Sequence, residues 1–374
     1  MSVSRKSVCH ITTLHPRYDV RIFLKECRSL VEDFDTYLIV ADGKGDEIRE
    51  NVKIIDAGLR GGTLRKRIFK TAPGVYKVAL GLNCNIYHFH DPEFIYQGYK
   101  LKKKGKQVVY DVHEDLPRQI HGKQYLNKAI RPIISFFSEQ AEKYFSQYFS
   151  AIVTSTPKIR DRFLKINHKT IDICNYVIVN EFTDNSGSLT KENRICYMGG
   201  LSSARGIREL VSSLNYIDPS YRLTLAGNFE RKDFENEIRA MADWMRVDFV
   251  GYVGRKEIAR ILYSSKIGIL GLHPTVSYID SLPVKLFEYM AAGIPVVASD
   301  FPLWREIITG NNCGICINPL SSKEISEAIV FLNTNPEIAK TMGENGRRAV
   351  VEKYNWETQK EKLLSLYLTL VFDI

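Results

Sequence analysis

The sequence lacks the glycine-rich signatures of two common classes of nucleotide-dependent enzyme. Neither half of the chain has G-x-G-x-x-G after its first expected strand, and HITTLHPRYD, at the end of the first one, contains no glycine. Those glycines let the backbone approach a pyrophosphate closely, so their absence argues against a dinucleotide-dependent dehydrogenase. The P-loop pattern is absent too, which argues against an ATPase.

Long apolar runs are also missing. No stretch approaches the roughly 20 consecutive apolar residues that a membrane-spanning helix needs. The first residues, MSVSRKSVCHIT, are positively charged but lack the apolar core of a signal peptide. We therefore expect a cytoplasmic protein. Whether it also contacts the inner face of the cytoplasmic membrane is a question that the sequence leaves open.

Cysteine is sparse and unpatterned. The seven cysteines are Cys9, Cys27, Cys84, Cys174, Cys196, Cys313 and Cys316. Their odd number and scatter are typical of reduced thiols in a cytosolic protein. Only Cys313 and Cys316 have C-x-x-C spacing, and no second pair or histidine follows them. We interpret this spacing as a coincidence in a loop rather than as a zinc or redox site.

Length and charge indicate two domains and an anionic partner. A chain of 374 residues is long for one core, and 44% hydrophobic with 25% charged residues is typical of folded domains. Residues 1–175 hold 30 Lys and Arg against 19 Asp and Glu, a net charge of +11, whereas the rest has a net charge of −2. The basic half is expected to face nucleic acid, an anionic lipid leaflet or a phosphorylated substrate.

Short β-branched runs alternate with helical segments along the whole chain. The runs expected to be strands are VCHIT, TYLIVA, VKIID, NIYHFH, QVVYDV and AIVTS, then RICYMGG, RLTLAGN, VDFVGYV, KIGILGL and IPVVASD. Nearly continuous apolar strands suit parallel sheets buried on both faces. The polar segment IVNEFTDNSGSLTKENR divides the two sets. The pattern predicts an α/β protein of two Rossmann-like domains, 1–178 and 179–357, whose parallel sheets face a cleft, and a C-terminal helix over about 358–374 that packs back on the first domain.

The segment DSLPVKLFEYMAAGIPVVASD places Asp280, Lys285 and Glu288 beside an apolar helix. Pro283 suits the first turn of that helix, and Gly293 suits its end. The free amides and positive dipole end of a helix N-terminus suit a nucleotide diphosphate, and Glu288 could accept hydrogen bonds from a ribose. The structural alternative is that Asp280 caps the helix while Lys285 and Glu288 form an i,i+3 surface pair.

Asp280 and Glu288, followed by YMAAGIPVVASD, resemble the E-x7-E region of family 4 of the retaining nucleotide-sugar glycosyltransferases, which have the GT-B fold. Asp280 replaces the usual first Glu. YMGGLSSARGIRELVSSL is similar to the family's G-R-L-x-x-x-K-G, with Arg205 at the lysine position and Gly200 where arginine is common. LTLAGN, FVGYVGRKEIARIL, NNCGICINPLSSKEISEAI and YNWETQKEKLLSLY are similar in order and spacing. The resemblance covers essentially the whole second domain and, more weakly, the first.

The resemblance implies a GT-B architecture and transfer of a sugar from a UDP- or GDP-sugar to a hydroxyl group of a lipid-linked or surface glycan. It implies retention by front-face attack, with the nucleotide-sugar as substrate and no metal or other cofactor. His90, near the transferred sugar, and Asp280 are the implied catalytic residues, and Arg205 holds the diphosphate. The implied donor-binding residues are Gly199, Gly200, Arg205, Gly251, Tyr252, Pro283, Val284, Lys285, Leu286 and Glu288.

Polar residues gather after three strands of the first domain, in HPRYDVRIF, YHFHDPE and YDVHED. The acceptor-side candidates are His15, Asp19, Arg21, Asp91, Glu93, His113, Glu114 and Asp115. Binding groups concentrate at such strand ends. We expect His88 to be structural, and Asp19 and Arg21 either to pair with each other or to bind the acceptor. We expect no metal here, because acidic and histidine side chains also cap helices and the family needs no divalent ion.

Two further interpretations stay open. The substitutions at Asp280 and Gly200 allow a catalytically weak nucleotide-sugar-binding subunit that partners another transferase, whereas the leading hypothesis is an enzyme of polysaccharide assembly, such as lipopolysaccharide or capsule. Basic segments with aromatic residues, such as RPIISFFSEQAEKYFSQYFS and KLKKKGKQ, fit an anionic membrane surface. The alternative is that Phe136, Phe137, Tyr144, Phe145 and Tyr148 pack in the core. Nucleic acid is not expected, because no binding motif accompanies the charge.

Overall fold

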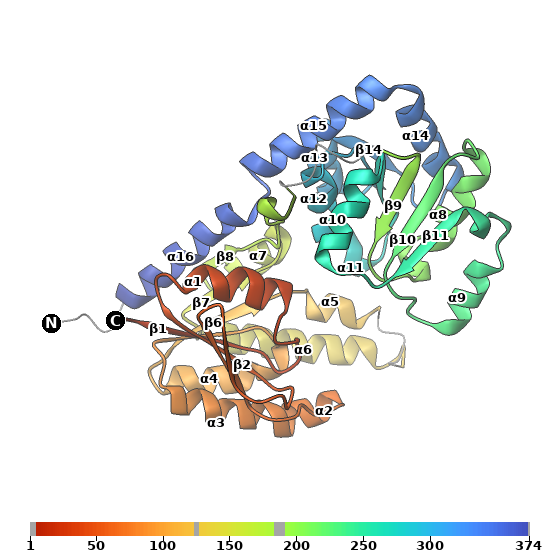
Figure 1. The fold of residues 1–374 in the computed structure, drawn as a ribbon. Helices are drawn as coiled ribbons and strands as arrows, with labels where there is room; N and C mark the ends of the chain where they lie inside the picture. The colour runs from red at the N-terminus through yellow and green to blue at the C-terminus, as the bar shows by residue number, and fades with distance from the viewer. Residues whose placement is uncertain (1–4, 123–126, 183–190, 373–374) are drawn as a thin grey trace. The chain divides into compact units, whose positions relative to one another are not determined.

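The computed structural model describes residues 5–122, 127–182 and 191–372 (Figure 1). The chain divides into two compact units. The first unit comprises Met1–Asn175 and Glu357–Ile374, and the second comprises Tyr176–Trp356. Each unit has a sheet and a core of its own.

The first unit is built on an eight-stranded sheet in the order β3-β4-β2-β1-β5-β6-β7-β8, in which only the β3–β4 pair is antiparallel. Its strands are β1 (Ser7–Ile11), β2 (Asp35–Val40), β3 (Glu47–Arg49), β4 (Val52–Asp56), β5 (Ile86–Phe89), β6 (Gln107–Val112), β7 (Ala151–Thr154) and β8 (Thr170–Asp172). His10 of β1 is in register with His88 of β5. Because β1, β5 and β6 are adjacent and parallel, the residues that follow them meet at one edge of the sheet.

Helices cover both faces of this sheet. They are η1 (Val20–Cys27, a π-helix), α1 (Arg28–Leu30), α2 (Leu64–Lys66), η2 (Arg67–Thr71), α3 (Ala72–Leu82), η3 (Pro92–Phe94), α4 (Ile95–Lys103), α5 (Leu116–Ile120), α6 (Arg131–Ser146), α7 (Pro157–Leu164) and α16 (Trp356–Phe372). Side chains alternate across a strand, so Cys9 and Ile11 pack in the core that includes α3 and α4. His10 points to the opposite face, where it meets η1 and α16.

The second unit is built on a six-stranded parallel sheet in the order β11-β10-β9-β12-β13-β14. Its strands are β9 (Arg194–Met198), β10 (Arg222–Ala226), β11 (Val247–Gly251), β12 (Ile267–Leu270), β13 (Val296–Ser299) and β14 (Gly314–Ile317). Its helices are η4 (Val179–Phe182), η5 (Ser203–Arg205), α8 (Ile207–Ser213), η6 (Leu214–Tyr216), α9 (Lys232–Arg239), η7 (Ala242–Arg246), α10 (Arg255–Ser264), α11 (Val276–Ile279), α12 (Val284–Ala291), α13 (Pro302–Gly310), α14 (Ser322–Thr334) and α15 (Pro336–Glu352).

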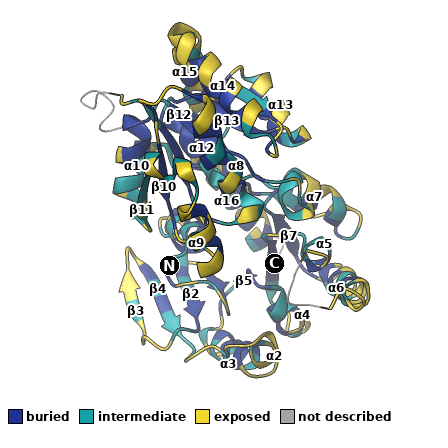
Figure 2. Ribbon diagram, turned by 90° about the vertical axis from the view of Figure 1, so that its right-hand side faces the viewer, coloured by how far each residue is buried: buried dark blue, intermediate teal, exposed yellow. Residues whose placement is uncertain are grey.

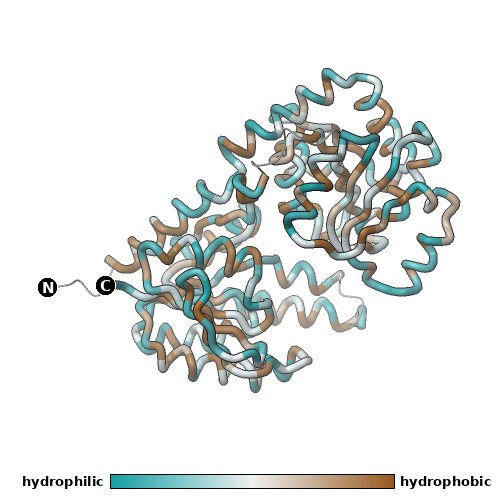
Figure 3. Tube along the Cα trace, in the orientation of Figure 1, coloured by the Kyte–Doolittle hydropathy of each residue, from teal (hydrophilic) through white to brown (hydrophobic). Residues whose placement is uncertain are grey.

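Both faces of the second sheet are buried. Cys196 and Met198 of β9 belong to one core, and the alternating Ile195 and Tyr197 belong to the other. Figure 2 shows the strands of this sheet buried beneath helices with exposed outer faces, and Figure 3 shows hydrophilic and hydrophobic residues mixed along the outer coils of the chain. This is the pattern of a parallel sheet covered on both sides. The predicted α/β architecture of two parallel-sheet domains is confirmed.

Two local features differ in part from expectation. Cys313 lies in the loop that directly precedes β14, and Cys316 lies within that strand, so the C-x-x-C spacing is only partly in a loop. Of the five aromatic side chains whose packing stayed open, Phe145 packs against the core, whereas Phe136, Phe137, Tyr144 and Tyr148 are exposed. Within the described residues, none of the helices combines the length and the apolar character needed to cross a bilayer.

Candidate active site

Two cationic side chains converge at the carboxyl end of β9. Gly199 follows this strand with φ +130°, and a Cβ added there would lie 2.5 Å from Nζ of Lys285 and 3.3 Å from NH1 of Arg205. A Cβ on the neighbouring Gly200 would lie 3.7 Å from Cζ of Arg205, which is an ordinary contact. The absence of a side chain at Gly199 therefore gives an ammonium and a guanidinium group room to approach the strand end together.

This convergence concentrates positive charge. Lys285 is partly exposed, but burial of its ammonium group, followed by the nearby charge of Arg205, lowers its pKa to about 8, and Glu288 only partly opposes this shift. Two like charges held close together disfavour the charged form of each. A bound anion would relieve this repulsion, and a guanidinium group can hold a phosphate through two parallel hydrogen bonds.

Lys285 lies in the first turn of α12, whose N-cap residue is Pro283. The first amides of a helix have no partner within it, and the side chain of Pro283 accepts no hydrogen bond that would cap them. Asp280 is placed at the C-terminal end of α11. The start of α12 can therefore face an anion.

Glu288 is buried one turn beyond Lys285. It is 6% exposed, and its Oε1 lies 3.6 Å from NH2 of Arg255. Nε of Arg255 also donates to both carboxylate oxygens of Glu181 at 2.9 Å. The surface-pair alternative for Lys285 and Glu288 is wrong, because Glu288 is buried and its ion pair is with Arg255. Sequence reasoning missed Arg255, although it opens the helix that directly follows the GYVG segment.

Three adjacent strands of the second unit end at glycines in left-handed backbone conformations. Gly199, Gly227 and Gly251 have φ of +130°, +143° and +66°. A Cβ on Gly227 would lie 1.8 Å from the carbonyl oxygen of Gly199, and the Gly227 amide donates to the Gly251 carbonyl at 2.7 Å. Predicted Gly251 therefore lies at the same sheet edge as Gly199, followed by Tyr252, which is 81% exposed. Gly227 was not predicted, though it follows an apolar strand as Gly199 does.

The remaining predicted donor residues have different surroundings. The side chain of Leu286 is fully buried in the core, and its amide donates to the Pro283 carbonyl at 3.1 Å. Val284 is half-buried at the first position of α12. Leu286 can therefore act on a ligand only through the packing of α12.

In the first unit, a second polar cluster lies at the carboxyl ends of β1, β5 and β6. Asp91, 2% exposed, accepts hydrogen bonds from Oγ1 of Thr12 at 2.8 Å and from the amide of Thr13 at 2.6 Å. His15 Nε2 lies 3.6 Å from Asp91, and His15 Nδ1 lies 3.4 Å from Asp19. The predicted residues His15, Asp19, Asp91, His90 and His113 thus come together here.

Three acceptor-side candidates lie in other pairings. Glu93 forms an ion pair with Arg67 at 2.6 Å, and Asp115 lies 3.5 Å from Arg162. Glu114 is exposed.

Asp19 and Arg21 do not pair through their side chains. The Asp19 carboxylate caps η1 by accepting from the backbone amides of Arg21 at 2.9 Å and Ile22 at 3.0 Å. The Arg21 guanidinium instead donates to both oxygens of Asp111 at 3.0 Å and lies 3.0 Å from Glu26. The interpretation of an Asp19–Arg21 pair is therefore wrong.

A chain of buried aromatic rings runs inward from this cluster. His113 Nε2 lies 3.0 Å from His90 Nδ1, and His90 Nε2 lies 3.0 Å from His10 Nδ1. His10 Nε2 lies 3.2 Å from the Tyr367 hydroxyl, which also hydrogen-bonds to His88. His88 is fully buried, consistent with the structural role expected of it. His10, Glu26, Asp111 and Tyr367 were not predicted, since each lies inside an apolar strand or helix.

Burial and the charge of Arg21 shift the pKa values of this network in different directions. It lowers the pKa of His90 to about 4 and raises the pKa of Glu26 well above its usual value. Burial alone would raise the pKa of Asp111, but Arg21 and then His113 outweigh it and hold that pKa well below its usual value. Glu26, His88, His90 and Asp111 could each offer a metal ion one ligand atom, all within 4.8 Å of one another. Arg21, which lies against both carboxylates, supplies positive charge there and competes with a cation.

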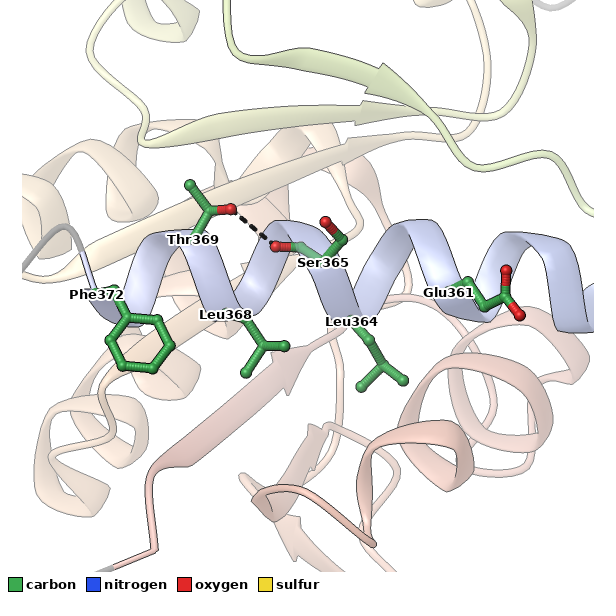
Figure 4. A pocket seen from close by; sticks show the side chains of 6 residues that line it. All are labelled: Glu361, Leu364, Ser365, Leu368, Thr369 and Phe372. Carbon is green, nitrogen blue, oxygen red and sulfur yellow. Dashed lines mark hydrogen bonds between the residues drawn. The ribbon is translucent and has the colours of Figure 1, made fainter.

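Two hollows on the first unit lie apart from these clusters. Figure 4 shows one along α16, with a volume of about 610 Å³, lined by Glu361, Leu364, Ser365, Leu368, Thr369 and Phe372. None of these residues belongs to either polar cluster. This hollow therefore has no part in the candidate chemistry.

Comparisons with known proteins agree with the two-unit architecture. The model of the family described as "Glycosyl transferases group 1" matches residues 179–349. An uncharacterised glycosyltransferase of Methanocaldococcus jannaschii is 22% identical over 260 residues, which cover 68% of this chain and 65% of that protein. An alpha-D-kanosaminyltransferase of Streptomyces kanamyceticus is 21% identical over 271 residues, which cover 67% of this chain and 69% of that protein.

Solved structures are similar over nearly the whole chain. Sucrose-phosphate synthase of Thermosynechococcus elongatus has a TM-score of 0.80 at 18% identity, covering 99% of this chain and 100% of that one. HepE of Anabaena, solved in complex with UDP, has a TM-score of 0.73 at 12% identity, covering 97% and 100%. The chain therefore has the GT-B fold of these structures, and its residues 179–349 form a glycosyl transferases group 1 domain.

Proposed function

We propose that the enzyme transfers a hexosyl group from a UDP- or GDP-sugar to a hydroxyl group of a lipid-linked or surface glycan, with retention and without a divalent metal or other cofactor. The convergence of Lys285 and Arg205 over Gly199 carries this proposal. A sugar leaves its nucleotide through an oxocarbenium-like state, so catalysis depends most on stabilising the negative charge that grows on the departing phosphate. Lys285, Arg205 and the first amides of α12 supply that stabilisation from the protein itself, which supports independence of a metal.

The surroundings of the cationic pair fit the rest of a nucleotide. Glu288 lies one turn from Lys285, where its carboxylate could accept hydrogen bonds from the two ribose hydroxyls. Tyr252, 81% exposed beside Gly251, offers a surface for the base. The complexes of HepE with UDP and with UDP-glucose make UDP the first nucleotide to test.

Calorimetric titration of the purified protein with UDP, GDP and their common sugar conjugates tests the donor, first in EDTA and then with magnesium. We expect micromolar binding of one nucleotide in EDTA. Lys285→Ala should weaken it at least tenfold, whereas Lys323→Ala, at an exposed position on α14, should not. Binding only with magnesium would refute metal independence, and no binding in either condition would refute the donor site.

A second function, a nucleotide-sugar-binding subunit without activity, is favoured by Gly200 and Asp280, which replace an arginine and a glutamate of the family pattern. Incubation with the bound donor and a panel of glycan and lipid-linked acceptors separates the two functions. Transfer, with the anomeric configuration of the product determined by NMR, supports the enzyme and tests retention. Tight binding of the donor without transfer to any acceptor supports the subunit.

The acceptor side of the proposal includes contact with anionic lipid. Ile133, Phe136 and Phe137 of α6 are 56%, 57% and 65% exposed, and Arg131 begins the same helix. An exposed apolar face with basic neighbours suits the surface of an anionic bilayer. We expect co-sedimentation with phosphatidylglycerol vesicles but not with phosphatidylcholine vesicles, and loss of it in the double variant Phe136→Ser, Phe137→Ser. Equal sedimentation of this variant would refute the membrane contact.

A further inference from the structure

Three charged side chains of the second unit, Glu181, Arg255 and Glu288, lie in succession beside the proposed ribose contact. Glu288 belongs to α12, Arg255 is the first residue of α10, and Glu181 belongs to η4. These three elements contribute to the same hydrophobic core. The core therefore fixes the backbone positions from which the three side chains meet, and all of their contacts lie within one unit.

Glu181 holds the guanidinium group of Arg255. Nε of Arg255 donates to both carboxylate oxygens of Glu181 at 2.9 Å, and NH2 of Arg255 donates to Oε2 as well. A guanidinium group and a carboxylate joined by several charge-assisted hydrogen bonds have a well-defined mutual geometry. Glu181 therefore determines how near the guanidinium group comes to Glu288.

Arg255 faces Glu288 across a longer gap. NH2 of Arg255 lies 3.6 Å from Oε1 of Glu288, which is an ion pair but too long for a hydrogen bond. The guanidinium group thus supplies positive charge to a carboxylate that is 6% exposed, while this contact occupies none of its lone pairs. An ionised carboxylate has about four acceptor positions, so Glu288 can accept from both hydroxyl groups of a ribose without losing Arg255.

A carboxylate as buried as that of Glu288 needs a nearby cation to stay ionised. The charge of Glu288 also reaches Lys285, but the Lys285 ammonium group lies 2.5 Å from the Cβ position of Gly199, where we expect it to bind phosphate. Arg255 is then the cation that stays with Glu288 when the donor is bound. Without Arg255, Glu288 would take up a proton, and a protonated carboxyl group has fewer acceptor positions for hydroxyl groups.

We propose that Arg255 is a positioning residue for recognition of the donor ribose. It keeps the Glu288 carboxylate ionised and oriented, and Glu181 keeps Arg255 at a distance that leaves the Glu288 oxygens to the hydroxyl groups. This inference rests on the proposed function. Selectivity for a ribonucleotide over its 2′,3′-dideoxy analogue then depends on two residues that act through Glu288 and need no contact of their own with the ribose.

Calorimetric titration measures this selectivity as the Kd of the 2′,3′-dideoxy analogue divided by the Kd of the ribonucleotide, with UDP, GDP and their analogues as probes. In the wild type this ratio should be about tenfold or more, because hydrogen bonds to a charged group contribute on that order. Arg255→Met should bring the ratio close to one. Arg255→Lys keeps a cation but loses the fork of donors, so it should restore part of the selectivity.

The matched control is Arg260→Met. Arg260 lies on the same helix, its side chain is 59% exposed, and it pairs with Glu257. This variant should keep the wild-type ratio, because it removes a guanidinium group from α10 without touching Glu288. Equal ratios in Arg255→Met and Arg260→Met would overturn the positioning role.

Glu181→Ala tests the outer contact. The released guanidinium group can then hydrogen-bond directly to Glu288 and occupy its oxygens, so the ratio should fall. The same substitution should have no further effect in the Arg255→Met background, because Glu181 acts only through Arg255. A fall of equal size in both backgrounds would refute that part of the proposal.

A second measurement needs no nucleotide. In urea unfolding, Arg255→Met should destabilise the protein that has Glu288 more than it destabilises the Glu288→Gln variant, because only Glu288 leaves a buried charge without this partner. Equal destabilisation would refute the coupling of Arg255 to Glu288 whatever the protein binds. Clear coupling in a protein that binds neither UDP nor GDP would instead support the ion pair and refute the proposed donor.

Discussion

Substitution of Gly199 by alanine should weaken the anion site by steric displacement of Lys285. The added Cβ would lie 2.2 Å from Cε of Lys285 and 2.5 Å from Nζ, distances at which the lysine side chain must move. The backbone φ of +130° is also unfavourable for any residue with a Cβ. The strained backbone should lower the free energy of unfolding, and the displaced lysine should weaken binding of the nucleotide.

The neighbouring glycines separate these costs. Gly251 has φ +66° and open space around its Cβ position, so Gly251→Ala carries backbone strain without a clash. The Cβ of Gly200→Ala would make only an ordinary contact with Arg205. A non-glycine residue in such a backbone region costs about 1–3 kcal/mol, so Gly199→Ala and Gly251→Ala should both lower the free energy of unfolding by that amount. Gly200→Ala should change it by less than about 0.5 kcal/mol.

Only Gly199→Ala should also remove a charged contact with the donor. A hydrogen bond to a charged group contributes about 1.5–3 kcal/mol, which corresponds to a roughly 10- to 100-fold weaker nucleotide affinity. Urea unfolding followed by circular dichroism measures the first effect, and calorimetric titration with the nucleotide measures the second. If Gly199→Ala bound the nucleotide as tightly as Gly200→Ala does, Lys285 would not be the phosphate ligand.

Three further outcomes follow from the same contacts. Glu288→Ala should weaken binding of the nucleotide more than binding of inorganic diphosphate, measured by calorimetry, and equal losses would argue against a ribose contact. Because the pKa of Lys285 is lowered to about 8 and only its ammonium form attracts phosphate, nucleotide affinity should fall as the pH rises above 8. Lys285→Arg, which stays charged, should flatten that titration, and an unchanged slope would place the titrating group elsewhere. Arg21→Met leaves the buried Asp111 without its guanidinium partner, beside only His90 and His113, so urea unfolding should show a loss of about 3–5 kcal/mol, and a loss below about 1 kcal/mol would show that the ion pair is dispensable.

Local sequence patterns were enough to predict the two sheets. The apolar runs VCHIT, NIYHFH and QVVYDV correspond to β1, β5 and β6. A short run that is apolar nearly throughout and lies between helical segments is typical of a parallel strand buried on both faces. Three short strands were missed. β3 and β8 have three residues each, too few for a repeating pattern, and β3 holds Glu47 and Arg49 at an exposed edge, as Figure 2 shows. β14 begins at Gly314, and glycine is depleted in strands.

The candidate site was predictable only where it follows a strand or starts a helix. Gly199, Arg205 and Lys285 stand in such places, and a turn or a helix start marks each of them in the sequence. Glu26 lies inside RIFLKEC, and nothing local distinguishes it from a surface residue of an amphipathic helix. Asp111 sits within an apolar strand, and its partner Arg21 is 90 positions away in the chain. Burial of such groups becomes visible only once distant segments are brought together.

Tyr367 gives the sharpest test of this long-range assembly, because its hydroxyl bridges two histidines that lie more than 270 positions earlier in the chain. The tyrosine is fully buried, so Tyr367→Phe leaves polar ring nitrogens of His10 and His88 without a partner in the core. An unsatisfied buried polar group costs about 1–3 kcal/mol, and the variant should lose at least that much of its free energy of unfolding in urea. Tyr216→Phe, which removes the same hydroxyl from a side chain that is 61% exposed, should lose less than about 0.5 kcal/mol. Equal stability of the two variants would mean that α16 is held to β1 and β5 by apolar packing alone. The hydrogen bonds of the Tyr367 hydroxyl to His10 and His88 would then contribute nothing to stability.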